Sequence, residues 1–172
     1  MSRRLTSVVL LAAALTGGGF ATGADAQSPA LLKGTFRLSG TVTVAQNVRG
    51  EHVGKAVTRT WTFAPQCPTA PCATVQLVRQ RATGSDTVTL RQTPAGYSGT
   101  GSFSAPLRCS GRIYPSGELI PFKITVRITS ATNGTASTIR ATYVNRARLN
   151  RTPCIGVLGH DAARYTGQLV AG

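Results

Sequence analysis

The sequence predicts an all-β fold: an antiparallel sheet of about eight strands that closes into an up-and-down barrel. Three observations lead to this. Apolar and polar residues alternate along most of residues 33–169, turn residues interrupt the alternation at regular intervals, and no amphipathic helix is recognisable after residue 26. A barrel is favoured over a sandwich because full closure removes the edge strands that an open sheet must protect.

The first two strands are expected at residues 33–45 and 55–64. In the first, alternate positions are apolar, namely Phe36, Leu38, Val42 and Val44. The second places Val57, Trp61 and Phe63 on one face and threonines on the other, and it ends at Pro65. Residues 46–54 contain two glycines and show no period, so they are expected to form a loop.

Three further strands are expected between residues 75 and 103. The third begins at Val75 and ends in Arg79 and Arg81, and the fourth contains Val88 and Leu90. The inward positions of the fifth strand are Tyr97, Gly99, Gly101 and Phe103. Glycine within a strand indicates a bend or a close approach of another group. Residues 106–117 are expected to be irregular.

The last three strands complete the predicted barrel. The sixth, at residues 122–129, alternates without a break. Asn133-Gly134 predicts a hairpin turn, after which Ile139, Ala141 and Tyr143 point inward. A loop then leads to a final strand at residues 163–169.

Residues 1–26 have the pattern of a secretory signal peptide. Arg3 and Arg4 supply the positive start, residues 5–14 are apolar, and Ala24-Asp25-Ala26 is a small-x-small cleavage site. The apolar run is well short of the roughly 20 residues that span a bilayer. We therefore expect one secreted domain over residues 27–172, with no transmembrane segment.

The cysteines predict two disulfides, because an even number in an exported chain favours pairing. They are Cys67, Cys72, Cys109 and Cys154. Pairing of Cys67 with Cys72 and of Cys109 with Cys154 is preferred, since Pro68 and Pro71 favour a tight bend between the first two. The spacing does not match a zinc knuckle, so no metal is expected.

The chain is strongly basic, with 19 Lys and Arg residues against five Asp and Glu residues. Such a charge attracts polyanions and keeps copies of the protein apart, so we expect a monomer. Arg140, Arg146 and Arg148, with Arg151 just beyond, form a candidate anion-binding stripe on one strand. A solvated outer face, with an arginine excess that follows from genome composition, is the alternative interpretation. No RNA-binding signature is present, and no specific nucleic-acid partner is expected.

No catalytic pattern is recognisable, and no cofactor is expected. The sequence contains neither a Gly-x-Ser-x-Gly elbow nor a His-Glu-x-x-His motif. The carboxylates after residue 26 are scattered, and His52 and His160 lie in polar segments. A non-enzymatic protein is therefore expected.

The barrel interior is the other candidate site, because an eight-stranded barrel is either filled or holds one small ligand. The candidate ligand-binding residues are Arg59, Trp61, Tyr97 and Phe103. A charge at the inward position of Arg59 must lie at the barrel mouth, be paired, or bind an anionic head group. Gly99, Gly101 and Gly167 are expected to leave room for a ligand, and ordinary core packing is the alternative.

The segment Trp61-Thr62-Phe63-Ala64-Pro65-Gln66-Cys67, followed by Cys72, resembles uncharacterised exported domains of high-G+C Gram-positive bacteria. These domains have a similar Trp-x-Phe-x-Pro-x-Cys segment and a first strand similar to Gly34-Thr35-Phe36. The resemblance implies export and no known activity. Gly34-x-Phe36 is also similar to the Gly-x-Trp of lipocalin first strands, so the barrel is expected to be lipocalin-like.

Together these patterns predict a non-catalytic extracytoplasmic binding domain. Its ligand is expected to be a small apolar or amphiphilic molecule in the interior, or an anionic envelope polymer on the exterior. The alternative is a secreted inhibitor or protein-interaction module that uses the Cys67–Cys72 loop.

Overall fold

The computed structural model describes residues 30–81, 84–151, 155–156 and 159–171. The expected signal peptide lies outside these ranges, as does Cys154. The described residues form strands and no helix. The strands are β1 (Gly34–Gln46), β2 (Ala56–Pro65), β3 (Thr74–Arg81), β4 (Gly84–Thr93), β5 (Gly96–Cys109), β6 (Arg112–Thr132), β7 (Thr135–Asn145), β8 (Leu149–Asn150) and β9 (His160–Ala171).

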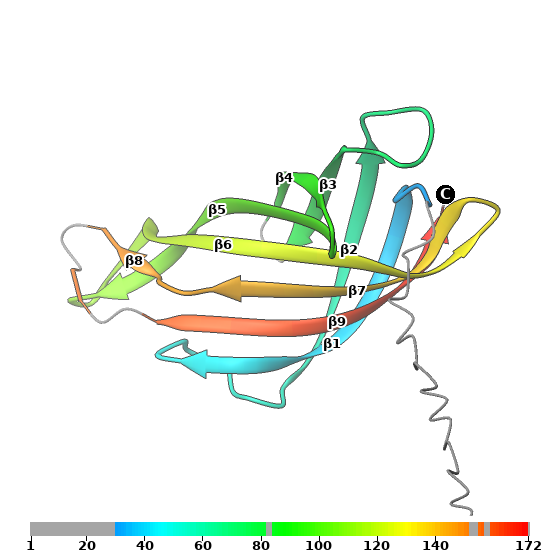
Figure 1. Cartoon of the computed structure of the whole chain (residues 1–172). Coiled ribbons are helices and arrows are strands. Elements are labelled where there is room, and N and C mark those ends of the chain that lie inside the picture. Colours follow the sequence, from blue (N-terminus) through cyan, green and yellow to red (C-terminus); the bar gives the residue numbers. More distant parts are fainter. Residues whose placement is uncertain (1–29, 82–83, 152–154, 157–158, 172) are drawn as a thin grey trace, which may run out of the picture.

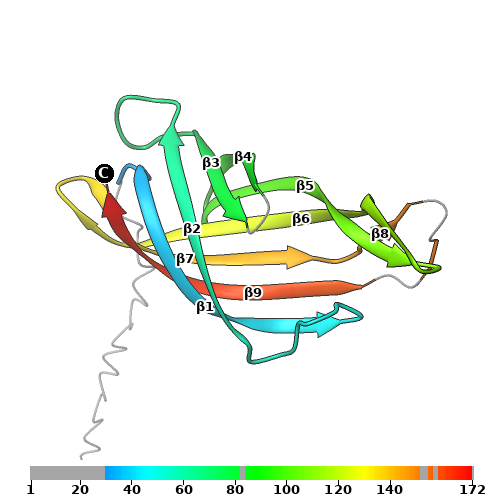
Figure 2. The same cartoon turned by 180° about the vertical axis from the view of Figure 1, so that it is seen from behind.

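Eight of these strands close into an antiparallel barrel with up-and-down order (Figure 1 and Figure 2). Each strand from β1 to β7 pairs with the next, β7 pairs with β9, and β9 returns to β1. The two-residue strand β8 pairs only with β6. The predicted all-β fold and up-and-down barrel are confirmed.

The alternation of side chains determines what lies inside the barrel. In β6, five apolar side chains are buried, namely Ile120, Phe122, Ile124, Val126 and Ile128. The positions between them are exposed or half-buried. Val44, which was expected to point inward, is exposed, because a register irregularity between β1 and β9 separates it from Val42. Elsewhere the predicted inward parity of β1 and β2 holds.

Two hairpins follow from pairs of residues with positive φ. Asn133 and Gly134 have φ values of 49° and 72° and form the predicted turn between β6 and β7. Ser110 and Gly111 have φ values of 48° and 75° and join β5 to β6 in the same way. The expectation of an irregular segment at residues 106–117 is therefore wrong. The β5–β6 hairpin continues through it, with a register irregularity between Ala105 and Leu107, and extends beyond the barrel (Figure 1).

One end of the barrel is covered by the segment that precedes β1. Ala30 and Leu32 are buried in the core cluster. The Leu31 amide donates to the carbonyl oxygen of Gly134, and the Ala136 amide donates to that of Leu31. We call this end the closed end.

The opposite end is open because strand pairing is incomplete there. Pairing between β2 and β3 stops at Trp61 and Arg79, so residues 56–60 of β2 pair only with β1. Pairing between β4 and β5 is confined to residues 91–93 of β4. Residues 80–81 of β3 thus pair only with β4, and residues 84–90 of β4 pair only with β3.

Candidate ligand-binding cavity

A cavity of about 730 Å³ lies at the open end. Its walls come from β1, β2, β3, β5, β7 and β9 and from the loop between β1 and β2. This volume is within the range of about 300–1,000 Å³ that small-molecule sites occupy. The incomplete pairing of β2 with β3 therefore produces a space large enough for a ligand.

Aromatic side chains form the apolar part of this cavity. Trp61 is only 2% exposed, and its ring centroid is 5.6 Å from that of Tyr165. Phe103 and Tyr143 line the cavity from β5 and β7. Of the predicted interior residues, Trp61 and Phe103 are thus brought together. Tyr143 and Tyr165 were placed inward by their parity, but they were not among the candidate ligand-binding residues.

The two tyrosine hydroxyls provide neutral polar groups. Burial raises the pKa of Tyr143 above its usual value, and the negative charge of Asp161 acts in the same direction. Burial also raises the pKa of Tyr165, against the opposing influence of Arg59. Both phenols are therefore protonated at neutral pH. Neither hydroxyl bonds to another side chain or carbonyl in the described part of the chain, so each is available to a ligand oxygen.

Arg59 provides an uncompensated positive charge at the mouth. It pairs in register with Leu38 of β1, lines the cavity, and is exposed through the open end. Its Nη1 atom donates to the carbonyl oxygen of Thr58 at 2.8 Å. No carboxylate of the described residues lies within ion-pair distance of it. Of the three expectations for this residue, a position at the mouth is the one observed.

Arg79 and Arg81 also point inward, and they share a single carboxylate, that of Asp86, which neutralises one of their two charges. The Nε and Nη2 atoms of Arg79 each donate to one oxygen of Asp86 at 2.6 Å. The Nε of Arg81 is 3.0 Å from an oxygen of the same carboxylate. The Arg81 guanidinium also lies over the ring of Phe103, with its Cζ 4.4 Å from the centroid. These contacts hold the β3–β4 hairpin against β5 and β6.

The inward positions of this ion pair were not recognised in the sequence. The alternation that begins at Val75 and Leu77 continues to Arg79, and Asp86 shares the parity of Val88 and Leu90. A charged residue at inward parity on each of two adjacent strands was the signal that could have identified the pair.

Arg148 is turned to the mouth of the cavity. Its Nη1 and Nη2 atoms donate to Glu118 and Asp161, each at 3.1 Å. Burial raises the pKa of Asp161, although Arg148 opposes this shift.

Because Arg148 is bound to these carboxylates, the expected stripe of four arginines is not formed. Strand β7 ends at the buried Asn145, whose Nδ2 donates to the carbonyl oxygens of Pro121 and Ala147 and redirects the chain.

The other arginines of the expected stripe lie on different segments. Arg140 is exposed on β7, Arg146 follows the end of that strand, and Arg151 follows β8. The expected stripe assumed that the strand continues through Arg146 and Arg148, whereas β7 ends at Asn145.

Of the predicted ligand-binding residues, Tyr97 lies in the core, away from the cavity, and does not line it.

The space for a ligand that was expected beside the inward glycines is filled by neighbouring side chains. A β-carbon on Gly101 would be 2.6 Å from the Phe122 ring, and one on Gly167 would be 2.8 Å from the Ile139 side chain. These glycines therefore permit close packing, and the cavity is created elsewhere by separated strands.

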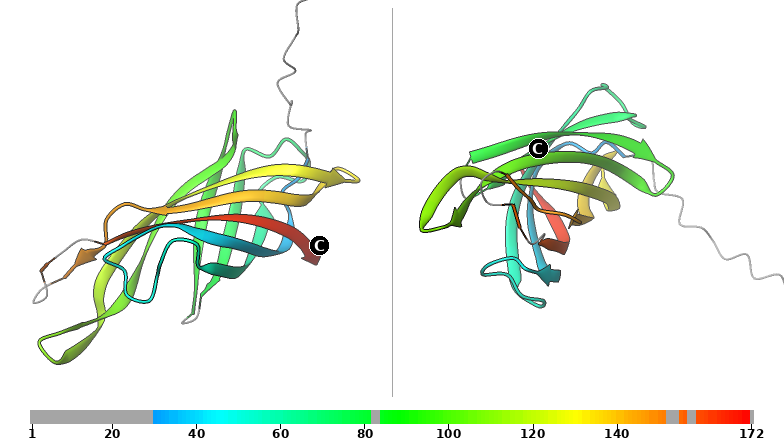
Figure 3. Two further views of the ribbon diagram at one scale, coloured as in Figure 1. Left: turned by 90° about the horizontal axis from the view of Figure 1, so that it is seen from below. Right: turned by 90° about the vertical axis from the view of Figure 1, so that its left-hand side faces the viewer.

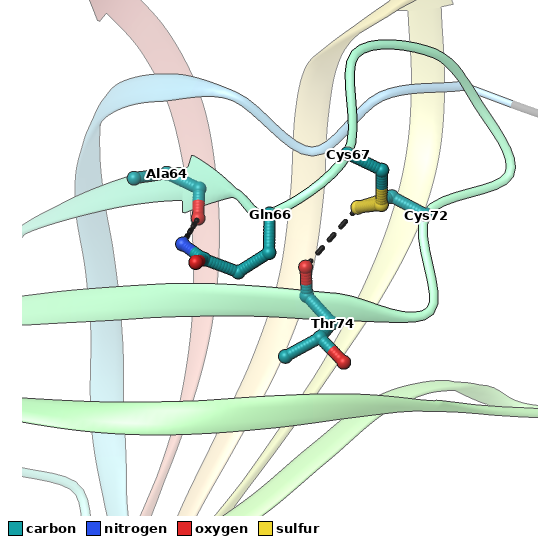
Figure 4. Close-up of a disulfide and its surroundings, with 5 residues drawn as sticks. All are labelled: Ala64, Gln66, Cys67, Cys72 and Thr74. Atoms are coloured by element: carbon teal, nitrogen blue, oxygen red, sulfur yellow. Dashed lines mark hydrogen bonds between the residues drawn. A yellow bond between two sulfur atoms is a disulfide. The ribbon is translucent and has the colours of Figure 1, made fainter.

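The predicted Cys67–Cys72 disulfide is present, at the closed end (Figure 4). Its Cα atoms are 5.6 Å apart, and Cys72 is fully buried. The Sγ of Cys72 contacts the carbonyl oxygen of Thr74 at 3.1 Å. Cys109 is not free, and its expected partner Cys154 lies outside the described residues. The Cys67–Cys72 loop thus lies at the end of the barrel opposite the cavity.

Within the described ranges, no three His, Cys, Asp or Glu side chains are grouped closely enough to hold a metal ion. That part of the chain also contains no helix of the length and apolarity needed to cross a membrane. Comparison with protein-family models, curated proteins and solved structures finds no significant match.

Proposed function

We propose that this protein is a non-catalytic binding protein that takes up a small amphiphilic anion in the open end of its barrel. The observation that carries the proposal is the uncompensated charge of Arg59 beside an aromatic cavity of about 730 Å³. An apolar pocket with a few convergent polar groups is the usual form of a small-molecule site. Arg59 would bind the anionic head, and Trp61 and Phe103 would contact the apolar body.

The other charges that line the cavity favour the same ligand. Arg79, Arg81 and Arg148 are already bound to carboxylates, so they fix the shape of the cavity. Arg37 and Arg49 line it without a carboxylate partner among the described residues and add to its attraction for an anion. The phenols of Tyr143 and Tyr165 stay neutral and donate hydrogen bonds without adding charge. A ligand with one acidic group and an apolar chain fits this arrangement better than a neutral lipid or a dication.

We infer that this binding takes place outside the cytoplasm. The Cys67–Cys72 disulfide supports this, because such bonds persist in oxidising compartments. The expected signal peptide at residues 1–26 points in the same direction.

The test uses oleate as the probe and oleyl alcohol as its neutral analogue. Trp61 is the only tryptophan of the chain, so its fluorescence reports on the cavity directly. We expect oleate to change the fluorescence saturably and to bind more tightly than the alcohol. Arg59→Gln should weaken oleate binding about tenfold or more, as the loss of a charged hydrogen bond of roughly 1.5–3 kcal/mol implies.

Arg140→Gln serves as the matched control, because it removes the same charge from the outer surface. It should leave oleate binding unchanged. Equal binding of oleate and oleyl alcohol, or equal losses in the two variants, would refute the proposed anion site.

A further inference from the structure

The outer wall of the barrel carries a second concentration of positive charge, separate from the cavity. Five exposed cations lie on β4, β6, β7 and β9, and we call them the basic wall. They are Arg91, Lys123, Arg127, Arg140 and Arg164. None of them lies within ion-pair distance of a carboxylate in the described part of the chain, and none lines the cavity at the open end.

The carboxylates are segregated from this wall. Those of the described residues are Glu51, Asp86, Glu118 and Asp161, and each is bound to a Lys or Arg side chain near the open end. Among the described residues, no carboxylate is therefore left to neutralise the basic wall.

Strand register places the cations close to one another. Arg127 of β6 lies directly opposite Arg140 of β7. Arg140 is paired with Thr166 of β9, and Arg164 is two residues away on that strand. Directly opposed side chains have Cβ atoms about 5 Å apart and diagonal ones about 7–8 Å apart. Like charges opposite each other destabilise a sheet, and a bound anion would remove this cost.

Hydroxyl groups fill the space between the cations. One row across the sheet runs from Arg91 through Ser98, Thr125 and Thr142 to Arg164. The Thr125 and Thr142 hydroxyls bond to each other, so the wall offers guanidinium donors in a regular array with Ser98 and one of these two threonine hydroxyls between them. Arg91 and Lys123 also line a shallow groove of about 550 Å³ where β4 separates from β5.

The shape and composition of the wall define its partner. Figure 3 shows these strands curving around the barrel, so a flat membrane would reach only part of the array, whereas a flexible chain can follow it. Aromatic side chains of β1–β7 and β9 are directed inward, apart from Tyr114 on the hairpin extension. The wall therefore has no platform on which nucleic-acid bases could stack.

We propose that the basic wall binds a linear polyanion with phosphate groups in its backbone and no aromatic bases. Guanidinium groups bind phosphate oxygens with paired hydrogen bonds, and the neighbouring Ser and Thr hydroxyls add donors. The wall lies outside the cavity, so this proposal stands independently of the interior ligand.

The experiment uses long-chain inorganic polyphosphate as the probe and measures its affinity for the purified protein at increasing salt. Five phosphate contacts imply a loss of about 100-fold in affinity between roughly 50 and 200 mM salt. Replacing Arg127, Arg140 and Arg164 together by Gln should lower the salt slope by about two units, since each contact contributes about 0.7 units on a single chain.

The control replaces Arg108, Arg112 and Arg151 by Gln, which removes the same charge from exposed positions at the β5–β6 extension and beyond β8. Its salt slope should stay close to that of the unmodified protein. Far-ultraviolet circular dichroism checks that both triple variants are folded. If the basic-wall triple variant is unfolded, the single variant Arg140→Gln is used in its place, and it should lower the salt slope by about 0.7 units.

Three outcomes would overturn the proposal. An equal decrease of the salt slope in the two triple variants would show that the positive charge acts without regard to its position. Tighter binding to phosphatidylglycerol vesicles than to polyphosphate at equal phosphate would identify a membrane surface. A strong preference for oligothymidylate at equal phosphate would identify a single-stranded nucleic acid.

Discussion

The Cζ atom of Arg79 lies 3.8 Å from the centroid of the Phe122 ring, inside the barrel. The guanidinium is thus held between an aromatic face and the carboxylate of Asp86. The arginine is 6% exposed, so neither interaction is strongly screened by water. This contact joins the β3–β4 hairpin to β6 across the interior at a level where β4 and β5 are not paired.

Asp86→Asn should destabilise the protein by roughly 3–5 kcal/mol, because it leaves a buried guanidinium without its counter-charge. Urea denaturation followed by circular dichroism measures the change. Glu51→Gln is the control, since the Glu51–Lys55 pair is much more exposed and should contribute less than about 1 kcal/mol. Similar losses in the two variants would contradict a buried, tightly coupled pair.

Trp61→Ala should cost roughly 3–5 kcal/mol, as expected for removal of a large buried aromatic side chain. The lost contacts include the rings of Phe63 and Tyr165. The loss of stability is measured as the decrease in the free energy of unfolding in a denaturant titration. A cost below about 1 kcal/mol would show that the side chain contributes to ligand contact and not to packing.

Asp161 should make stability depend on acid pH. Burial raises its pKa in the folded protein above the unfolded value of 3.8, so the folded state binds the proton more tightly. Its contribution to stability is therefore most favourable in acid and decreases as the pH rises from about 3.8 through the folded pKa.

Comparison with Asp161→Asn isolates this contribution, because the amide does not titrate. The stability of the unmodified protein relative to the variant should increase on acidification below neutral pH. A difference that is constant with pH, or one that decreases in acid, would contradict the raised pKa.

We predict that all the cysteines of the native protein are oxidised. Thiol titration of the denatured, unreduced protein is expected to detect no free thiol. On the chain-entropy model, opening the Cys67–Cys72 ring costs about 2 kcal/mol and opening the longer predicted Cys109–Cys154 ring about 4 kcal/mol. Denaturant titrations of the two double-alanine variants test this order, and two or more free thiols would contradict the pairing.

Strand positions were predictable because one face of each strand is buried. The alternation in β1, β2 and β6 has a period of two and needs no knowledge of neighbouring strands. The hairpin at Asn133-Gly134 was predictable because that dipeptide tolerates positive φ at both positions. Ser110-Gly111 carries the same geometry with a weaker sequence signal, so the extension of β5 and β6 was missed.

The cavity was only partly predictable. Trp61, Phe103 and Arg59 were found from parity, but Tyr97 shares that parity and lies away from the cavity. Parity assigns a side chain to the interior and says nothing about its height along the barrel axis. Height depends on register and on where pairing stops, and both are set by contacts between distant segments.

Because β1 pairs with β9, one edge of the first strand remains unpaired until the last strand has folded against it. Such a connection between distant segments slows folding, since a large loop must close before the contact forms. Throughout this interval β1 presents a free edge to which another chain could add. We expect the strong positive charge of the chain to oppose that encounter, so that repulsion between copies limits aggregation of the partly folded barrel before β9 pairs with β1.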